Sequence, residues 1–248
     1  MAQQITLYLA QICPAAHRVE IVLAEANVTN HTRYEIEIGP NKPKWFTEKV
    51  NPAGLVPAIT YGGPKVSPNQ PSPDSIKIGE SLIISEFIAD LYPACNLIPS
   101  DPVHRAKMRQ FMDAVMTKYV AAYAGVLIHG KPFEELYTAL EWLQNMLPSA
   151  ENTAGFAVGS GEEFTLADVA VATLFARMLI WMKMDLGAFE EGEGRKAYAY
   201  LHDSGKFVRL LKQFEAVKAR ESWKKTYDED MITEAYKIQL AAFRAGAA

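Results

Sequence analysis

The sequence has few of the residues that several classes of protein depend on. Its 248 residues include only two cysteines, and its five histidines are scattered without the spacing of metal ligands. Two cysteines in a chain of this length are not the disulfide framework of a small secreted protein. The formal net charge is −4, which argues against a general nucleic-acid binder, because neutralising phosphates requires a basic face.

Long apolar runs are also missing. No uninterrupted run approaches the roughly 20 apolar residues that a membrane helix needs. The first ten residues, MAQQITLYLA, have neither a basic start nor the long apolar stretch of a signal peptide. We therefore expect a cytoplasmic protein that has no membrane or nucleic-acid partner and needs no metal. Hydrophobic residues make up 49% and charged residues 22%, which is an ordinary globular balance.

The first 90 residues alternate between strand and helix patterns. The opening strand, helix and strand predict a parallel pair joined by a right-handed crossover. Residues 62–75 are rich in Gly, Pro, Ser and Asn and predict a loop. The predicted elements are strands at Gln4–Leu9, Thr32–Ile38, Leu55–Tyr61 and Ile76–Ile78, and helices at Ala15–Ala26, Lys44–Val50 and Ser81–Leu91. In the last helix we expect Leu82, Ile83, Ile84, Phe87, Ile88 and Leu91 to be buried.

The pattern changes after residue 92. Two prolines and little periodicity predict a linker over 93–103, and the remaining chain is helical with no assignment for 185–206. We therefore expect an α/β domain over 1–92 and an all-helical domain over 104–248. The helices expected there are Val103–Val126, Phe133–Leu147, Phe164–Met184, Phe207–Trp223 and Asp230–Phe243.

Cys13 is the strongest candidate for a reactive group. It stands between a predicted strand and a predicted helix that begins with Pro14. The positive end of a helix and its free N–H groups stabilise a thiolate, which is the nucleophilic form of cysteine. A buried structural cysteine is the alternative. Position 16 is Ala16, so the motif has no second thiol at the spacing of a two-cysteine redox site.

Two further segments have features of a binding site. Glu80 and Ser81 open a predicted helix and suit a ligand end that has both an ammonium and a carboxylate, although plain capping explains them equally well. Residues 51–57, NPAGLVP, predict a turn followed by an extended residue, Val56, before Pro57. Few X–Pro bonds are cis, so spacing does not establish a cis bond there.

The helical half contains apolar residues that recur at helical spacing. Phe111, Met112, Tyr119 and Tyr123 fit a packed core, and they also suit the wall of a hydrophobic pocket. Thr165 with an acid three residues later predicts a capping box, which is a structural feature.

Together these segments resemble the omega class of glutathione transferases. The resemblance rests on the order Cys-Pro-x-x-x-Arg, NKPKWF, NPAGLVP and GES, followed by LYPACNLIPSD and FTLADVAVATLFARM. It is dense over residues 5–101 and looser afterwards. It implies a thioredoxin-like N-terminal domain, an all-α C-terminal domain, a homodimer, glutathione as co-substrate, and a hydrophobic or disulfide co-substrate. The chain looks like a fungal or otherwise divergent member.

The resemblance also implies roles for individual residues. Cys13 would form a mixed disulfide with glutathione, and Lys42 would meet the glycyl carboxylate. Val56 would pair through its backbone with the cysteinyl part, before a cis Pro57. Glu80 and Ser81 would hold the γ-glutamyl group. A hydrophobic co-substrate pocket would include Ala15, Phe111, Met112 and Tyr119.

Two functions follow from this resemblance. The first is a thiol transferase or reductase, acting in deglutathionylation or dehydroascorbate-type reduction. The alternative is a ligandin-type protein that binds hydrophobic small molecules with catalysis vestigial. A channel-forming relative ranks last, because residues 10–35 contain too many polar groups for a membrane segment. The alanines after Pro14, the loop 62–75 and the segment 185–206 depart from the family pattern.

Overall fold

The computed structural model describes residues 3–39, 42–149 and 154–244, with side chains described as far as residue 238. The chain divides into two compact units, Met1–Cys95 and Asn96–Ala248. The predicted linker at 93–103 contains a short 3₁₀-helix, Pro93–Cys95, and the first residues of a long helix.

The first unit is a four-stranded sheet with the order β2-β1-β3-β4. Strand β1 pairs in parallel with β2 and antiparallel with β3, which pairs antiparallel with β4. This sheet with its helices is the thioredoxin-like arrangement, and the predicted fold class is confirmed. Its elements are β1 Ile5–Leu9, α1 Pro14–Glu25, β2 Thr32–Glu35, α2 Lys44–Lys49, β3 Ala58–Tyr61, β4 Ile76–Gly79 and α3 Ser81–Leu91.

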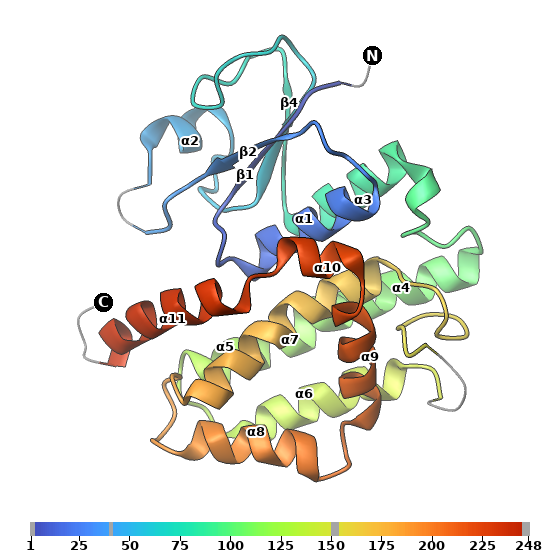
Figure 1. Ribbon diagram of the computed structural model, residues 1–248, viewed down its shortest axis with the longest axis vertical. Helices are drawn as coiled ribbons and strands as arrows, with labels where there is room; N and C mark the ends of the chain where they lie inside the picture. The colour runs from blue at the N-terminus through green and yellow to red at the C-terminus, as the bar shows by residue number, and fades with distance from the viewer. Residues whose placement is uncertain (1–2, 40–41, 150–153, 245–248) are drawn as a thin grey trace. The chain divides into compact units, whose positions relative to one another are not determined.

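Helices α1 and α3 pack against each other (Figure 1). All five residues of β1 are buried, as expected of a central strand. In α3 the side chains of Ile84 and Ile88 are buried, whereas Ile83 is 59% exposed. The expectation that all six apolar residues of this helix are buried is therefore wrong: Ile83 lies on the other face from the i, i+4 pair, and Leu82, Phe87 and Leu91 are only partly buried.

An aromatic cluster supports the turn that leads into β3. Tyr8 and Phe46 are fully buried with ring centroids 5.8 Å apart, and Trp45 lies 6.0 Å from Tyr8. The Tyr8 hydroxyl donates to the carbonyl of Pro68 at 2.8 Å, which ties the loop 62–75 to the cluster. The loop is further fixed by the Lys77 ammonium, which donates to three loop carbonyls at 2.6 to 3.1 Å.

The second unit is built around one buried helix. Helix α7, Leu166–Met184, is buried along nearly its whole length, and Figure 1 shows the other helices of the unit arranged around it. The remaining elements are α4 Pro102–Ala114, a π-helical turn Val115–Tyr119, α5 Val120–Leu127, α6 Phe133–Met146, α8 Glu193–Asp203, α9 Val208–Lys218, α10 Glu221–Thr226 and α11 Glu229–Arg244.

Two expectations for this unit are corrected, and the segment without an assignment, 185–206, contains α8. The helix expected over 207–223 is two helices, because Arg220 adopts an extended conformation with φ −71° and ψ 145°. The helix expected over 103–126 contains the π-helical turn. No helix in the described ranges is long and apolar enough to cross a membrane.

Candidate functional site

Cys13 lies at the junction of β1 and α1, in the N-cap position of the helix. Its backbone N–H donates to the Ala10 carbonyl at 2.9 Å, and its side chain does not cap the helix. The thiol is partly exposed and lies 3.8 Å from the Val56 carbonyl oxygen. The first intrahelical hydrogen bond runs from the His17 amide to the Cys13 carbonyl. The helix amides that precede His17 therefore point out of the helix end as donors, except at Pro14, which has no N–H. The helix end favours negative charge at this position, whereas the Val56 carbonyl oxygen accepts from the neutral thiol.

The turn at residues 51–57 brings Val56 to the thiol. The Asn51 side chain shapes the turn, donating to the Leu55 carbonyl at 2.8 Å and accepting from the Ala53 amide at 3.2 Å. The Val56–Pro57 peptide bond is cis. Val56 therefore lies at the end of a well-defined turn, with its carbonyl oxygen toward the sulfur.

The Lys42 side chain contacts the same turn. Its ammonium donates to the Gly54 carbonyl, two residues before Val56. Gly54 has φ +66°, in the left-handed region, where a residue without a side chain is unstrained. The structure therefore brings Cys13, Val56 and Lys42 together around residues 51–57.

Glu80 and Ser81 form the junction of β4 and α3. Glu80 has φ +67°, a conformation that is strained for a residue with a side chain and that recurs at functional sites. Ser81 is buried, and its hydroxyl accepts from the Arg18 guanidinium at 3.2 Å. Arg18, only 2% exposed, thus connects the helix that begins at Cys13 with the start of α3. Sequence reasoning placed Arg18 in the motif but did not find this contact, because the two residues are 63 positions apart.

The residues proposed for the co-substrate pocket lie in both units. Ala15 is half-buried in the first unit. Phe111, Met112 and Tyr119 are buried in the helical unit, where the Tyr119 hydroxyl donates to the Met178 sulfur at 3.3 Å. Phe111 also lines a cavity of about 700 Å³. That these residues contact a co-substrate remains a prediction.

An aromatic cluster beside Tyr119 was not foreseen as a unit. Tyr123 lies 6.1 Å from Tyr119 and 6.2 Å from Trp181, which in turn lies 5.9 Å from Tyr236. Burial raises the pKa of Tyr123 well above its usual value, so its phenol stays protonated. The Trp181 indole N–H is buried and has no acceptor among the described residues. The signal in the sequence was a tryptophan within a largely apolar helix.

The residues that the structure describes contain no cluster of metal-ligating side chains. Within the described ranges, no three His, Cys, Asp or Glu side chains are close enough together to hold a metal ion.

Comparisons with known proteins agree with this geometry. Residues 12–91 match the family described as glutathione S-transferase, N-terminal domain. The chain is 44% identical to glutathione transferase Omega 1C from Trametes versicolor, with 96% of this chain and 97% of that one covered and a TM-score of 0.88. It is 36% identical to Omega 2S from the same organism, solved in complex with 2,4-dihydroxybenzophenone, with coverage of 96% and 100% and a TM-score of 0.86. It is also 32% identical to mouse glutathione S-transferase omega-1 over 111 residues, which span 45% of this chain and 40% of the mouse protein.

Proposed function

Since the chain belongs to the omega class of the glutathione transferases, we propose that it is a thiol transferase whose Cys13 carries a glutathionyl group between two sulfur partners. The observation that carries the proposal is the position of the Cys13 thiol. It is partly exposed at the start of α1 and stands opposite the Val56 carbonyl, with no second cysteine in its motif. A single thiolate at a helix start supports transfer through a covalent intermediate.

The proposed reaction has two displacement steps. In the first, the Cys13 thiolate attacks the glutathionyl sulfur of a mixed disulfide, which forms the Cys13–glutathione disulfide and releases the other thiol as its thiolate, protonated by solvent. In the second, a free glutathione thiolate attacks the glutathionyl sulfur, which releases glutathione disulfide and restores the Cys13 thiolate. Because the motif lacks a resolving cysteine, this second thiol must come from glutathione.

The same residues support a direction for bound glutathione. We place the cysteinyl part along the Val56 backbone, next to the sulfur of Cys13. The γ-glutamyl end would meet Glu80 and Ser81, whose backbone N–H groups begin α3 and favour a carboxylate. The glycyl carboxylate would meet the ammonium of Lys42. We further propose a cytoplasmic homodimer that acts in detoxification.

Replacing Lys42 with alanine tests this direction. We expect the dissociation constant for glutathione to rise roughly tenfold to a hundredfold, because a hydrogen bond to a charged group contributes about 1.5–3 kcal/mol. The effect should be much smaller for γ-glutamylcysteine, which lacks the glycyl residue. Ser81→Ala should weaken both ligands similarly, because both keep the γ-glutamyl group. Isothermal titration calorimetry on each pair measures the four changes.

Lys44→Ala is the matched control. Lys44 is exposed two residues away, so its removal changes the net charge equally and should leave both affinities unchanged. Equal losses for the two ligands in Lys42→Ala would mean that this lysine acts by shaping the turn through the Gly54 carbonyl, and the direction of the ligand would be wrong.

Transfer itself is tested by replacing the thiol. Release of a thiol from a glutathionylated peptide should be lost in Cys13→Ser and kept in Cys95→Ser, since Cys95 lies in the 3₁₀-helix at the end of the first unit.

A ligand-binding role is the second candidate. The Trametes versicolor Omega 2S protein was solved with 2,4-dihydroxybenzophenone, and here Tyr119, Tyr123 and Trp181 form a buried aromatic cluster with an unused indole donor. This role needs no reactive thiol. Binding of an aromatic ketone that persists fully in Cys13→Ser would support it alongside transfer.

A further inference from the structure

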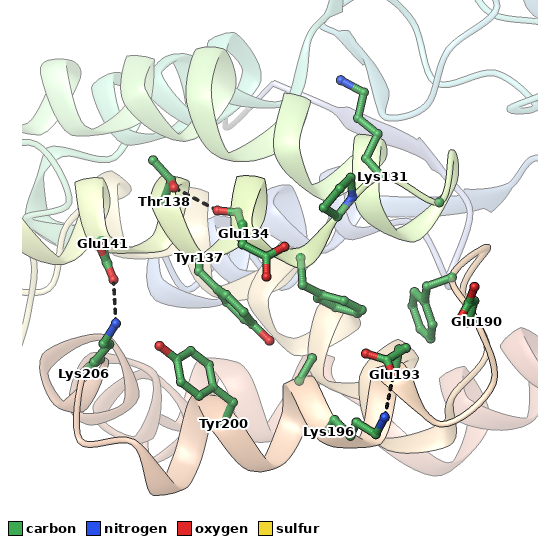
Figure 2. A pocket seen from close by; sticks show the side chains of 15 residues that line it. Lys131, Glu134, Tyr137, Thr138, Glu141, Glu190, Glu193, Lys196, Tyr200 and Lys206 are labelled. Atoms are coloured by element: carbon green, nitrogen blue, oxygen red, sulfur yellow. Dashed lines mark hydrogen bonds and ion pairs between the residues drawn. The ribbon is translucent and has the colours of Figure 1, made fainter.

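A cavity of about 750 Å³ lies between α6 and α8. Every residue that lines it falls between Gly130 and Lys206, so the cavity belongs to the helical unit, whereas Cys13 and the other proposed glutathione residues belong to the first unit. Figure 2 shows side chains of the two helices converging on it from opposite sides. The cavity therefore shares no residue with the proposed glutathione site.

Four aromatic rings form a continuous wall of this cavity. Phe189 lies 5.0 Å from Phe133, which lies 6.0 Å from Tyr137 in a stacked arrangement, and Tyr137 lies 4.7 Å from Tyr200. Phe133 and Phe189 are buried, and the two tyrosines are partly exposed. The wall thus supplies aromatic rings, and organic cations are attracted to the faces of such rings.

Charged side chains surround the opening of the cavity, and they are not all paired with one another. Two of its lysines are engaged within the rim, Lys196 with Glu193 at 2.6 Å and Lys206 with Glu141 at 3.7 Å. Its third lysine, Lys131, pairs with Glu135, which does not line the cavity.

Two rim carboxylates remain. Among the residues that the structure describes, no cation lies within ion-pair distance of Glu134 or Glu190, and both are exposed. Lys196, already paired with Glu193, acts on Glu190 only at longer range. Because four glutamates and three lysines line the cavity, its net charge is negative, and it favours an incoming cation.

One ring of the wall already holds a cation. The ammonium of Lys206 lies over the Tyr200 ring, 5.6 Å from its centroid. Burial, with a smaller contribution from Glu134, raises the pKa of Tyr137 to about 12, so this phenol remains neutral and adds no negative charge of its own. The wall therefore attracts cations through its ring faces, and the negative charge comes from the glutamates.

From this arrangement we propose that the cavity binds an organic ammonium ion, whose apolar part packs on Phe133, Tyr137 and Phe189 and whose charge is balanced by Glu134 and Glu190. This site is separate from the proposed thiol transfer and does not depend on it. An aromatic anion, such as a phenolate, is the competing ligand, because three lysines also line the cavity.

Two variants that change the charge of the rim in opposite directions test whether the ligand is a cation or an anion. The probe is benzyltrimethylammonium, with phenylacetate as the anion of similar size, titrated into the full-length protein by calorimetry. The double variant Glu134→Gln/Glu190→Gln keeps the shape of the rim and removes two negative charges. It should lower the affinity for benzyltrimethylammonium roughly tenfold. Lys206→Met removes the lysine ammonium that competes for the Tyr200 ring, and it should raise the affinity for benzyltrimethylammonium several-fold.

The side chains chosen make no backbone contacts that the fold requires. The hydrogen bonds of the main chain at these positions use the carbonyls of Glu134, Glu190 and Lys206 and the Lys206 amide, all of which the substitutions retain. Unchanged melting temperatures would verify this. The proposal is overturned if the wild type gives no saturable binding of benzyltrimethylammonium, if phenylacetate binds equally well, or if both variants shift the affinity in the same direction.

Discussion

Cys13→Ser should lower the rate of thiol transfer by about a thousandfold or more while glutathione still binds. A serine hydroxyl is too weak a nucleophile to attack a disulfide sulfur, and removing a nucleophile that forms a covalent intermediate costs rates of this size. The hydroxyl at the start of α1 can still donate to the thiolate of bound glutathione, next to the Val56 carbonyl. We therefore expect the variant to gain conjugation of glutathione to an aryl halide.

Two further measurements separate loss of chemistry from loss of structure. The dissociation constant for glutathione should change less than the rate of transfer. Cys95→Ser should keep wild-type transfer, because Cys95 is the other thiol and lies in the 3₁₀-helix Pro93–Cys95. Full transfer by Cys13→Ser would show that another group carries the glutathionyl moiety.

Asp168→Asn should destabilise the helical unit by about 3–5 kcal/mol. The Asp168 carboxylate is completely buried and accepts from the backbone amides of Thr165 and Ala157 at 2.9 and 2.8 Å and from the Gln213 amide at 2.7 Å. An asparagine offers one acceptor oxygen and turns an NH₂ group toward the remaining donors. Each buried donor left without an acceptor costs about 1–3 kcal/mol. Denaturant unfolding of the two proteins measures the difference.

The difference in stability between the wild type and Asp168→Asn should also depend on pH, in a direction that the pKa of Asp168 predicts. Burial raises the pKa of Asp168 to about 6, above its usual value of 3.8. A carboxyl group with a raised pKa in the folded state stabilises the fold below its unfolded pKa, and this contribution is lost as pH rises through 6. The stability advantage of the wild type over Asp168→Asn should therefore grow between pH 7 and pH 5, on the order of 1 kcal/mol.

Asp101→Asn is the matched control for the capping substitution. Asp101 also caps a helix, accepting from the His104 amide at 2.8 Å, but it is exposed at the start of α4. Its hydrogen bond to His104 lowers the pKa of its carboxyl group, so its contribution changes with pH in the opposite direction. A comparable loss of stability in the two variants would show that burial of Asp168 is not what makes it important.

The first unit follows its sequence closely because its signals are local. Alternating strands, Pro14 at a helix start and the proline-rich turn each specify their own segment. The third strand is shorter than predicted, since Asn51 takes the Leu55 carbonyl and the turn extends to Pro57 before β3 begins at Ala58. The capping box at Thr165 is confirmed for the same local reason.

Helix α8 could not be read from the sequence because its start is capped from outside. Asp185 at the end of α7 accepts from the amides of Gly192 and Gly194 at 2.7 and 2.9 Å. A side chain at Gly194 would approach the Phe189 ring and the Asp185 carboxylate within 2.7 Å, so glycine is required in what otherwise reads as a loop. The contact between Arg18 and Ser81 was hidden likewise, since it depends on the packing of α1 on α3.

The central claim is that Cys13 carries the glutathionyl group, and mass spectrometry tests it most directly. The full-length protein is exposed to oxidised glutathione, digested without reductant and mapped, with Cys13→Ser and Cys95→Ser treated alongside. We predict one glutathionyl group on the peptide that contains Cys13 in the wild type and in Cys95→Ser, removed when free glutathione is added. An adduct found only on Cys95, or a Cys13 adduct that free glutathione does not remove, would contradict the proposed transfer.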